Sequence, residues 1–159
     1  MAIKKGDKLP STTLSRMGEN GPEKVETDAL FAGKTAVVFA VPGAFTPTCS
    51  ARHLPGFVDH LDAIKAKDVD MVACLSVNDV FVMNAWGKSA DAKGIEMLAD
   101  GNGDFAKAMG LEMDGTGFGM GTRSQRYAMI VKDGVVSELF VEEPGAFEVS
   151  SAEHVLKAL

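Results

Sequence analysis

The sequence predicts an α/β fold in which a mixed central β-sheet is flanked by helices, giving three layers. Apolar segments rich in β-branched residues alternate with segments of helical periodicity, which is typical of strands and helices that take turns along the chain. Asp133-Gly134 separates two strand-like segments and is the strongest short hairpin signal in the sequence. The chain has 159 residues, 46% of them hydrophobic, so we expect one domain over residues 1–159.

The predicted strands are short and regularly spaced. The first 25 residues hold strand candidates separated by polar, Gly-rich turns. The segment 36–41 (AVVFAV) is continuously apolar and β-branched, as expected of a central strand covered on both faces, and Pro42-Gly43 ends it. Further strands are predicted at the following ranges: 69–77, 95–99, 127–132 and 135–141.

The predicted helices fill the intervals between strands. Apolar side chains repeat at helical spacing over 48–67, where Pro55 should kink or interrupt the helix. Asn78-Asp79 offers an N-cap for the next helix, and Asp104 is expected to cap the one after that. Ser150–Glu153 reads S-x-x-E, a capping box that predicts a final helix.

Charge and hydropathy exclude several classes of partner. The 16 Lys and Arg residues against 22 Asp and Glu residues give a formal charge of −6, which argues against nucleic-acid binding. The longest apolar run, 36–41, is far too short to span a membrane. The first ten residues contain lysines but no apolar run, so we expect a cytoplasmic protein, with a removed organelle-targeting peptide left open.

The two cysteines, Cys49 and Cys74, limit the chemistry further. They are too few for a disulfide-rich scaffold or for a four-cysteine zinc site. No H-x-x-x-H or C-x-x-C pattern is present, so no metal site is expected. Three alternatives remain for the pair: both are buried thiols, they form one disulfide, or one of them is a reactive thiol.

Cys49 stands where a loop rich in breakers, PGAFTPTC, leads from the 36–41 strand into a helix. Free N–H groups at a helix start favour an anion, so a thiol there ionises more readily than an ordinary one. Thr46 is three residues upstream, and a tight loop would bring its hydroxyl beside the sulfur. This pattern predicts a nucleophilic thiol, while an inert cysteine at a buried helix end stays open from position alone.

These residues also carry a resemblance. The segment from Pro42 to Phe57, PGAFTPTCSARHLPGF, resembles the active-site loop of the peroxiredoxins, and its GAF and HLPGF flanks resemble the peroxiredoxin-5 (type II, atypical) group. Two further segments, VACLSVNDVFVMNAWGK at 72–88 and RYAMIVKDGVV at 126–136, are similar to later parts of the same family. The likeness therefore runs over nearly the whole chain.

The resemblance implies a thioredoxin-like fold and a thiol peroxidase that reduces hydrogen peroxide and small organic hydroperoxides without a cofactor. It implies Cys49 as the nucleophile that becomes a sulfenic acid, Thr46 as its hydrogen-bonding hydroxyl and Pro42 as a shield. It implies Arg126 as the cationic partner, in preference to Arg123, because Arg126 directly precedes the late strand. Family members commonly form dimers, so a homodimer is expected.

The resemblance leaves the role of Cys74 open. In plant type II members a cysteine at this spacing is credited as the resolving thiol, whereas its place in an apolar strand predicts a buried core residue. The favoured alternative is a one-cysteine cycle, in which glutathione or glutaredoxin reduces the sulfenic acid; thioredoxin is a further candidate. A redox-sensing protein that passes oxidation to a partner and a thiol–disulfide oxidoreductase are competing functions.

Other side chains receive lesser roles. His53, one helical turn beyond Cys49, is expected to be structural or at the pocket rim, and Phe45 is expected at that rim as well. His60 and His154 are expected on the surfaces of their helices. The Gly-rich segment 115–121 is predicted to be a mobile loop that leads toward the arginine.

Overall fold

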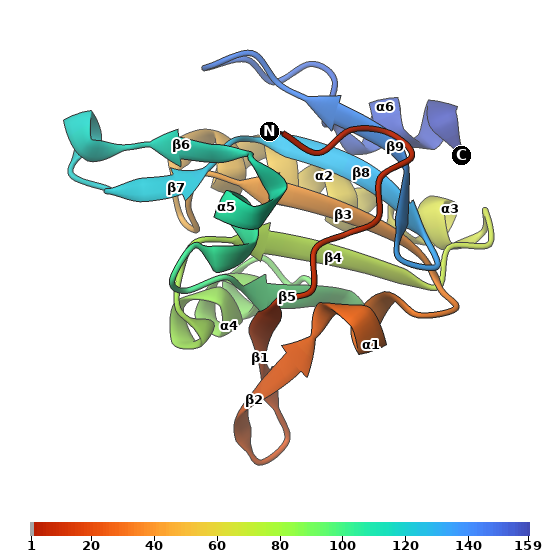
Figure 1. The fold of residues 1–159 in the computed structure, drawn as a ribbon, viewed down its shortest axis with the longest axis horizontal. Coiled ribbons are helices and arrows are strands. Elements are labelled where there is room, and N and C mark those ends of the chain that lie inside the picture. Colours follow the sequence, from red (N-terminus) through yellow and green to blue (C-terminus); the bar gives the residue numbers. More distant parts are fainter. Residues whose placement is uncertain (1) are drawn as a thin grey trace.

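The computed structural model describes residues 2–159 and contains a seven-stranded sheet in the order β2-β1-β5-β4-β3-β8-β9 (Figure 1). Its elements in chain order are β1 (Thr13–Gly18), β2 (Gly21–Glu26), α1 (Thr27–Phe31), β3 (Thr35–Val41), the π-helix η1 (Cys49–His53), α2 (Leu54–Asp59), α3 (Leu61–Lys65), β4 (Met71–Ser76), α4 (Val80–Ser89), β5 (Ile95–Ala99), α5 (Asp104–Met109), β6 (Glu112–Asp114), the 3₁₀ turn η2 (Thr116–Phe118), β7 (Thr122–Ser124), β8 (Tyr127–Lys132), β9 (Val135–Val141) and α6 (Ala152–Ala158).

The sheet is mixed, as predicted. β3, β4 and β5 run parallel at its centre. On one side β8 pairs antiparallel with β3 and β9 pairs antiparallel with β8, while on the other side β1 of the β1–β2 hairpin pairs antiparallel with β5. Parallel strands need covered faces, and helices lie on both sides of this sheet (Figure 1). The predicted three-layer α/β fold class is thereby confirmed.

Alternation along β3 divides the core into two layers. Odd-numbered side chains from 37 to 41 pack with α2, α3, α4 and α6, and both cysteines belong to this layer. Even-numbered side chains from 36 to 40 pack with α1 and α5 on the opposite face. All but the first residue of this strand are buried, as the continuous apolar run predicted.

The helical segment predicted at 48–67 is interrupted, and it divides into η1, α2 and α3. Pro55 has no N–H to donate to the turn before it, and the last bond of that turn runs from Leu54 N to Cys49 O, the longer π-type step. His60, with φ −101° and ψ 8°, then separates α2 from α3. Pro55 therefore shapes the turn that begins at Cys49.

Helix capping differs from the prediction at α5. Asp79 accepts a hydrogen bond from Val82 N at 2.8 Å, so the predicted cap of α4 is confirmed. Asp104 was expected to cap α5 but makes no capping bond there, because Gly103 holds the N-cap position with φ 77°. Asp100 does this work instead, since its carboxylate accepts from Phe105 N at 3.0 Å and Ala106 N at 2.9 Å.

The last helix begins one residue later than the capping box predicted. Ser151 caps α6, and its Oγ accepts from His154 N at 3.2 Å. Ser150 does not cap this helix: it is fully buried, and its N–H and hydroxyl both donate to Glu142 Oε2. The Gly-rich segment 115–121, which the sequence predicts to be a mobile loop, closes a two-stranded ribbon formed by β6 and β7.

Across residues 2–159, none of the helices combines the length and the apolar character needed to cross a bilayer.

The Asp100 carboxylate should contribute more to the free energy of unfolding than the carboxylate of the neighbouring Asp104. Asp100→Ala leaves two buried backbone N–H groups without an acceptor, so we expect the free energy of unfolding to fall by about 2 kcal/mol. Asp104→Ala, a matched control in the same loop, should cost less than about 1 kcal/mol. Urea unfolding of both variants measures this, and equal losses would contradict the assignment of the cap.

Candidate active site

Two adjacent strands bring the candidate residues to one edge of the sheet. β3 ends at Val41, and the loop 42–48 leads from it to Cys49 at the start of η1. β8 runs antiparallel beside β3 with Tyr127 opposite Ala40, so Arg126 comes just before β8 at the end where β3 finishes. The register of these two strands therefore places Arg126 beside the loop that carries Cys49.

The Cys49 sulfur is the centre of this group. Its side chain is fully buried and accepts hydrogen bonds from Thr46 Oγ1 at 2.8 Å and from Arg126 Nη2 at 3.1 Å. Arg126 stays cationic at any physiological pH and donates through a planar fork. A hydroxyl and a guanidinium that converge on one sulfur stabilise negative charge on it.

Thr46 has two partners for one hydroxyl proton. Its oxygen lies 2.7 Å from Gly43 O and 2.8 Å from Cys49 Sγ. When the sulfur is a thiolate, the hydroxyl donates a hydrogen bond to it. When the sulfur carries a proton, the hydroxyl oxygen accepts a hydrogen bond from the S–H group and the hydroxyl donates to Gly43 O. The loop thus offers a hydrogen bond to either protonation state of Cys49.

Behind Arg126 lies His53, a residue that the sequence suggested for the pocket rim. The rim placement is wrong: His53 is fully buried, and its ring packs against those of Phe39 and Phe57 in the core. Its Nδ1 accepts from Arg126 Nη1 at 2.8 Å, and its Nε2 donates to Ser150 O at 2.9 Å. The structural alternative for this histidine fits these contacts.

The protonation state of His53 follows from its surroundings. Burial, and after it the positive charge of Arg126, lower the pKa of His53 to about 3, although the hydrogen bond to the Ser150 carbonyl opposes both effects. A neutral imidazole with its proton on Nε2 is the tautomer that donates to Ser150 and accepts from Arg126. His53 can therefore orient the guanidinium without competing with its charge.

The pocket beside this group is a cavity of about 320 Å³. Pro42, Thr48 and Arg126 are among the residues that line it, together with Glu112, Glu142 and Glu143. Phe45 does not line this cavity, contrary to the expectation that it forms the rim. Its backbone has φ 64°, and its side chain is 53% exposed, with its ring 6.3 Å from that of Trp86.

Cys74 is in the middle of β4, paired with Phe39 of β3 on one side and Met97 of β5 on the other. It is fully buried in the same core layer as Cys49, and both thiols are free. Burial raises the pKa of Cys74 well above its usual value, with the nearby Cys49 adding to the effect and Arg126 opposing it. In this conformation Cys74 is a protonated core thiol.

Two further residues support the site in ways that the sequence did not indicate. Arg123 donates to Val77 O and Met120 O, so it holds the β6–β7 ribbon in place and has no bond to the sulfur. Asn78 was considered only as a helix cap, yet its Oδ1 accepts from Ala44 N at 2.9 Å and ties down the cysteine loop.

The aromatic and carboxylate residues on the far side of the site were also missed. Trp86 Nε1 donates to Ser50 Oγ at 3.0 Å, which links the cysteine-bearing turn to α4. The Phe147 ring lies 4.9 Å from the His53 ring, and Arg126 Cζ lies 5.9 Å from its centroid. Glu142 holds the segment that carries Phe147. These contacts join residues far apart in the chain, which spacing along a sequence cannot reveal.

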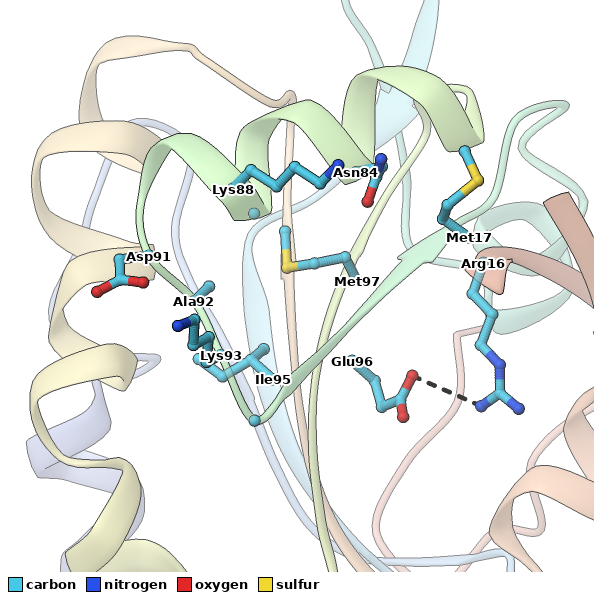
Figure 2. Close-up of a pocket in the computed structure, with 12 residues that line it drawn as sticks. Arg16, Met17, Asn84, Lys88, Asp91, Ala92, Lys93, Ile95, Glu96 and Met97 are labelled. Atoms are coloured by element: carbon cyan, nitrogen blue, oxygen red, sulfur yellow. Dashed lines mark ion pairs between the residues drawn. The ribbon is translucent and has the colours of Figure 1, made fainter. Parts of the chain in front are cut away.

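Another cavity, of about 350 Å³, opens between β1, α4 and β5 (Figure 2). Arg16 lies at its edge and is paired with Glu23 at 2.7 Å and Glu96 at 3.5 Å. Its lining residues include no cysteine and no histidine. Among residues 2–159 no group of three or more His, Cys, Asp or Glu side chains is arranged to hold a metal ion. The sulfur site is therefore the candidate for chemistry.

The buried neutral His53 should make stability depend on pH. In the unfolded chain histidine binds a proton below about pH 6.5, whereas the folded form stays neutral down to about pH 3, so acidification through this window favours unfolding. Between pH 6.5 and 5.0 we expect the wild type to lose about 1–2 kcal/mol more unfolding free energy than His53→Asn, which keeps an acceptor for Arg126. Urea denaturation at the two pH values tests this, and equal losses would contradict it.

Comparison with known proteins identifies the family of this chain. A match to the Redoxin family covers residues 4–156. Peroxiredoxin-2E, chloroplastic, of Arabidopsis thaliana is 50% identical over 163 residues, which is 99% of this chain and 70% of that protein.

Solved structures agree in fold. Reduced Prx3 from Vibrio vulnificus, crystallised in complex with H2O2, is 56% identical with a TM-score of 0.96, covering 98% of both chains. Peroxiredoxin 5 from Alvinella pompejana is 32% identical with a TM-score of 0.87, covering 98% of this chain and 97% of that one. This chain therefore belongs to the Redoxin family and, within it, to the peroxiredoxins of the peroxiredoxin-5 type.

Proposed function

We propose that this peroxiredoxin reduces hydrogen peroxide and small organic hydroperoxides through a sulfenic acid on Cys49. One observation carries the proposal: the buried sulfur is held between the Thr46 hydroxyl at 2.8 Å and the Arg126 guanidinium at 3.1 Å. The Vibrio vulnificus relative was crystallised with H2O2, which supports the same substrate here.

In the proposed step the Cys49 thiolate attacks the terminal oxygen of the hydroperoxide. A sulfur–oxygen bond forms and the oxygen–oxygen bond breaks, so the sulfur is oxidised by two electrons to a sulfenic acid. The departing oxygen takes up a proton and leaves as water or an alcohol. The Arg126 guanidinium donates hydrogen bonds that stabilise the negative charge as it moves from the sulfur to the leaving oxygen. The Thr46 hydroxyl can accept or donate a hydrogen bond as the proton moves to that oxygen.

Pro42 completes the proposed site. It is half-buried, lines the cavity beside Arg126 and has no N–H that would need a partner there. A wall of this kind limits water around the sulfur, which strengthens the electrostatic effect of the guanidinium.

The cycle is completed by an external thiol in this proposal. Glutathione attacks the sulfenic acid to give a mixed disulfide and water, and a second thiol, from glutathione or glutaredoxin, releases the reduced Cys49. The burial and the raised pKa of Cys74 support this one-cysteine cycle, because a protonated thiol inside a central strand is a poor nucleophile. Thioredoxin is the alternative reductant.

A homodimer is proposed for the assembly. Three exposed aromatic residues support it: Phe45 in the cysteine loop, Phe81 at the start of α4 and Phe118 at the tip of the β6–β7 ribbon, which are 53%, 63% and 83% exposed. Sedimentation equilibrium should give twice the chain mass of 16.8 kDa, and Phe81→Asp should shift the protein toward the monomer. A wild type that stays monomeric at all concentrations would remove the proposal.

Cytoplasmic localisation is kept as a proposal as well. One relative is described as chloroplastic, so an organelle is the competing location. Fractionation of the source cells with an antibody to this chain would distinguish the two locations.

Removing the nucleophile or the cation should separate their roles. We expect Cys49→Ser to abolish peroxide consumption with glutathione and glutaredoxin, because no sulfur remains to be oxidised. Arg126→Gln should lower the second-order rate constant with hydrogen peroxide by about 100-fold or more. Stopped-flow kinetics measures both, and Arg123→Gln is the matched control, expected within a fewfold of wild type. Peroxide turnover by Cys49→Ser would refute the proposed function, and a single turnover without recycling by any thiol would favour a redox sensor.

The Cys74→Ser variant tests the one-cysteine cycle. We expect it to keep wild-type steady-state peroxide reduction with glutathione and glutaredoxin, with the thioredoxin system compared in parallel. Peptide mass analysis of wild-type protein treated with peroxide in the absence of thiol should find no link between the two cysteine peptides. A product lighter by two protons that joins those peptides would make Cys74 the resolving thiol.

A further inference from the structure

A buried carboxylate lies at the end of β9, outside the group of residues that contacts the sulfur. Glu142 is 6% exposed, and its Oε2 accepts four hydrogen bonds from the segment that follows. The donors are Glu148 N at 2.8 Å, Val149 N at 2.9 Å, Ser150 N at 2.8 Å and Ser150 Oγ at 2.7 Å. One oxygen therefore closes the chain from 143 to 150 into a loop.

The closed loop reaches the active site through Ser150. The carbonyl of this residue accepts from His53 Nε2 at 2.9 Å, and His53 Nδ1 accepts from Arg126 Nη1 at 2.8 Å. Arg126 Nη2 then donates to Cys49 Sγ at 3.1 Å. A continuous series of hydrogen bonds thus runs from the Glu142 carboxylate to the sulfur.

Glu142 also contacts Arg126 directly. Its backbone N–H donates to Arg126 O at 3.0 Å, so the backbone of Glu142 and the loop it closes hold the arginine at two points. The same loop carries Phe147, whose ring packs against His53 and lies over Arg52 at 4.7 Å. The cost of burying the Glu142 charge is offset by its four donors, and as a result its pKa is lowered although burial alone would raise it.

We propose that Glu142 is a positioning residue for Arg126, acting through Ser150 and His53. With the loop closed, the imidazole fixes one branch of the guanidinium and the other branch faces Cys49. Without the negative charge, the four donors lose a charged acceptor and are held less strongly, so the Ser150 carbonyl is less firmly fixed and His53 can rotate. Arg126 keeps its charge but loses the direction in which it donates, and orientation is what such a donor contributes to catalysis.

This inference rests on the proposed peroxidase activity of Cys49 but is tested by two readouts, one of which needs no peroxide. The variant is Glu142→Gln, which removes the charge while keeping the size of the side chain. Glu138→Gln is the matched control, since Glu138 is in the same strand and pairs with Lys5 on the surface at 2.7 Å. His53→Leu supplies the background in which the connection to Arg126 is already broken.

In the first readout, the second-order rate constant with hydrogen peroxide should fall about tenfold in Glu142→Gln. The same substitution made in His53→Leu should change it less than twofold, because residues that act in series are not additive. Glu138→Gln should stay within twofold of wild type. A loss of the same size in both backgrounds, or no loss, would overturn the proposal and leave Glu142 a brace for α6.

In the second readout, the rate of Cys49 alkylation by iodoacetamide is followed against pH, with peptide mapping to identify the labelled residue. The midpoint should move to higher pH by about half a unit in Glu142→Gln and stay in place in Glu138→Gln. A wild type that alkylates in this way but consumes no peroxide would refute the peroxidase function alone. An unmoved midpoint in the variant would refute the positioning role alone.

Circular dichroism and urea unfolding of each variant come before both readouts. If Glu142→Gln does not fold, Ser150→Ala replaces it, because this change removes one of the four donors and keeps the charge and the carbonyl. Its rate loss should then be about two- to threefold, and again absent in His53→Leu. A Ser150→Ala variant with the wild-type rate and midpoint would overturn the proposal in that case.

Discussion

The guanidinium of Arg126 joins parts of the molecule that are distant in the sequence. One branch reaches the sulfur of Cys49, 77 residues earlier in the chain, and the other reaches His53. Its backbone belongs to the approach to β8, while the imidazole and the sulfur belong to the helical layer on one face of the sheet. Both of its partners are buried, and burying a cation costs free energy unless acceptors receive its N–H groups. The neutral state of His53 and the free sulfur lone pairs of Cys49 supply those acceptors.

The central sheet and the cysteine loop could be predicted because their signals are local. The continuous apolar run at 36–41 predicted a strand buried on both faces, and Asp133-Gly134 predicted the hairpin between β8 and β9. Asp79 was recognised because a cap acts over three residues. Pairings of this kind depend on neighbours in the chain, which a sequence displays directly.

The errors have a common physical origin. Asp100 caps α5 across four intervening residues, because Gly103 takes a left-handed conformation that moves Asp104 past the capping position. Ser150 looked like the first residue of a capping box, but a buried carboxylate eight residues upstream uses its N–H and hydroxyl. His53 was expected to be structural or at the pocket rim, since nothing local indicates that the turn after Cys49 buries it fully. In each case a tertiary partner decided between roles that are equally good locally.

The turn that carries Cys49 is held by side-chain hydrogen bonds at its first residues, whereas the backbone hydrogen bonding of the segment after it is interrupted. Its sulfur and the Ser50 hydroxyl are held by bonds to Arg126 and Trp86. This turn is η1, and the short helices α2 and α3 follow it. Pro55 and His60 interrupt the regular hydrogen-bond ladder of this segment. Segments of this kind open at lower free energy than the strands beneath them. Any rearrangement of the site is therefore expected in these helices, while β4, which holds Cys74 between two neighbours, stays in place.

The pairing of Ala40 with Tyr127 has a consequence for how this site can change over evolution. Successive residues of a strand face opposite sides of a sheet, so one residue added between Arg126 and the hydrogen-bonded part of β8 would turn the guanidinium toward the layer that contains α1 and α5. Residues added at the Asp133-Gly134 turn or at the tip of the β6–β7 ribbon would leave it where it is. The register of β3 and β8 therefore fixes the side of the sheet on which Arg126 lies, and insertions are tolerated wherever they leave this register unchanged.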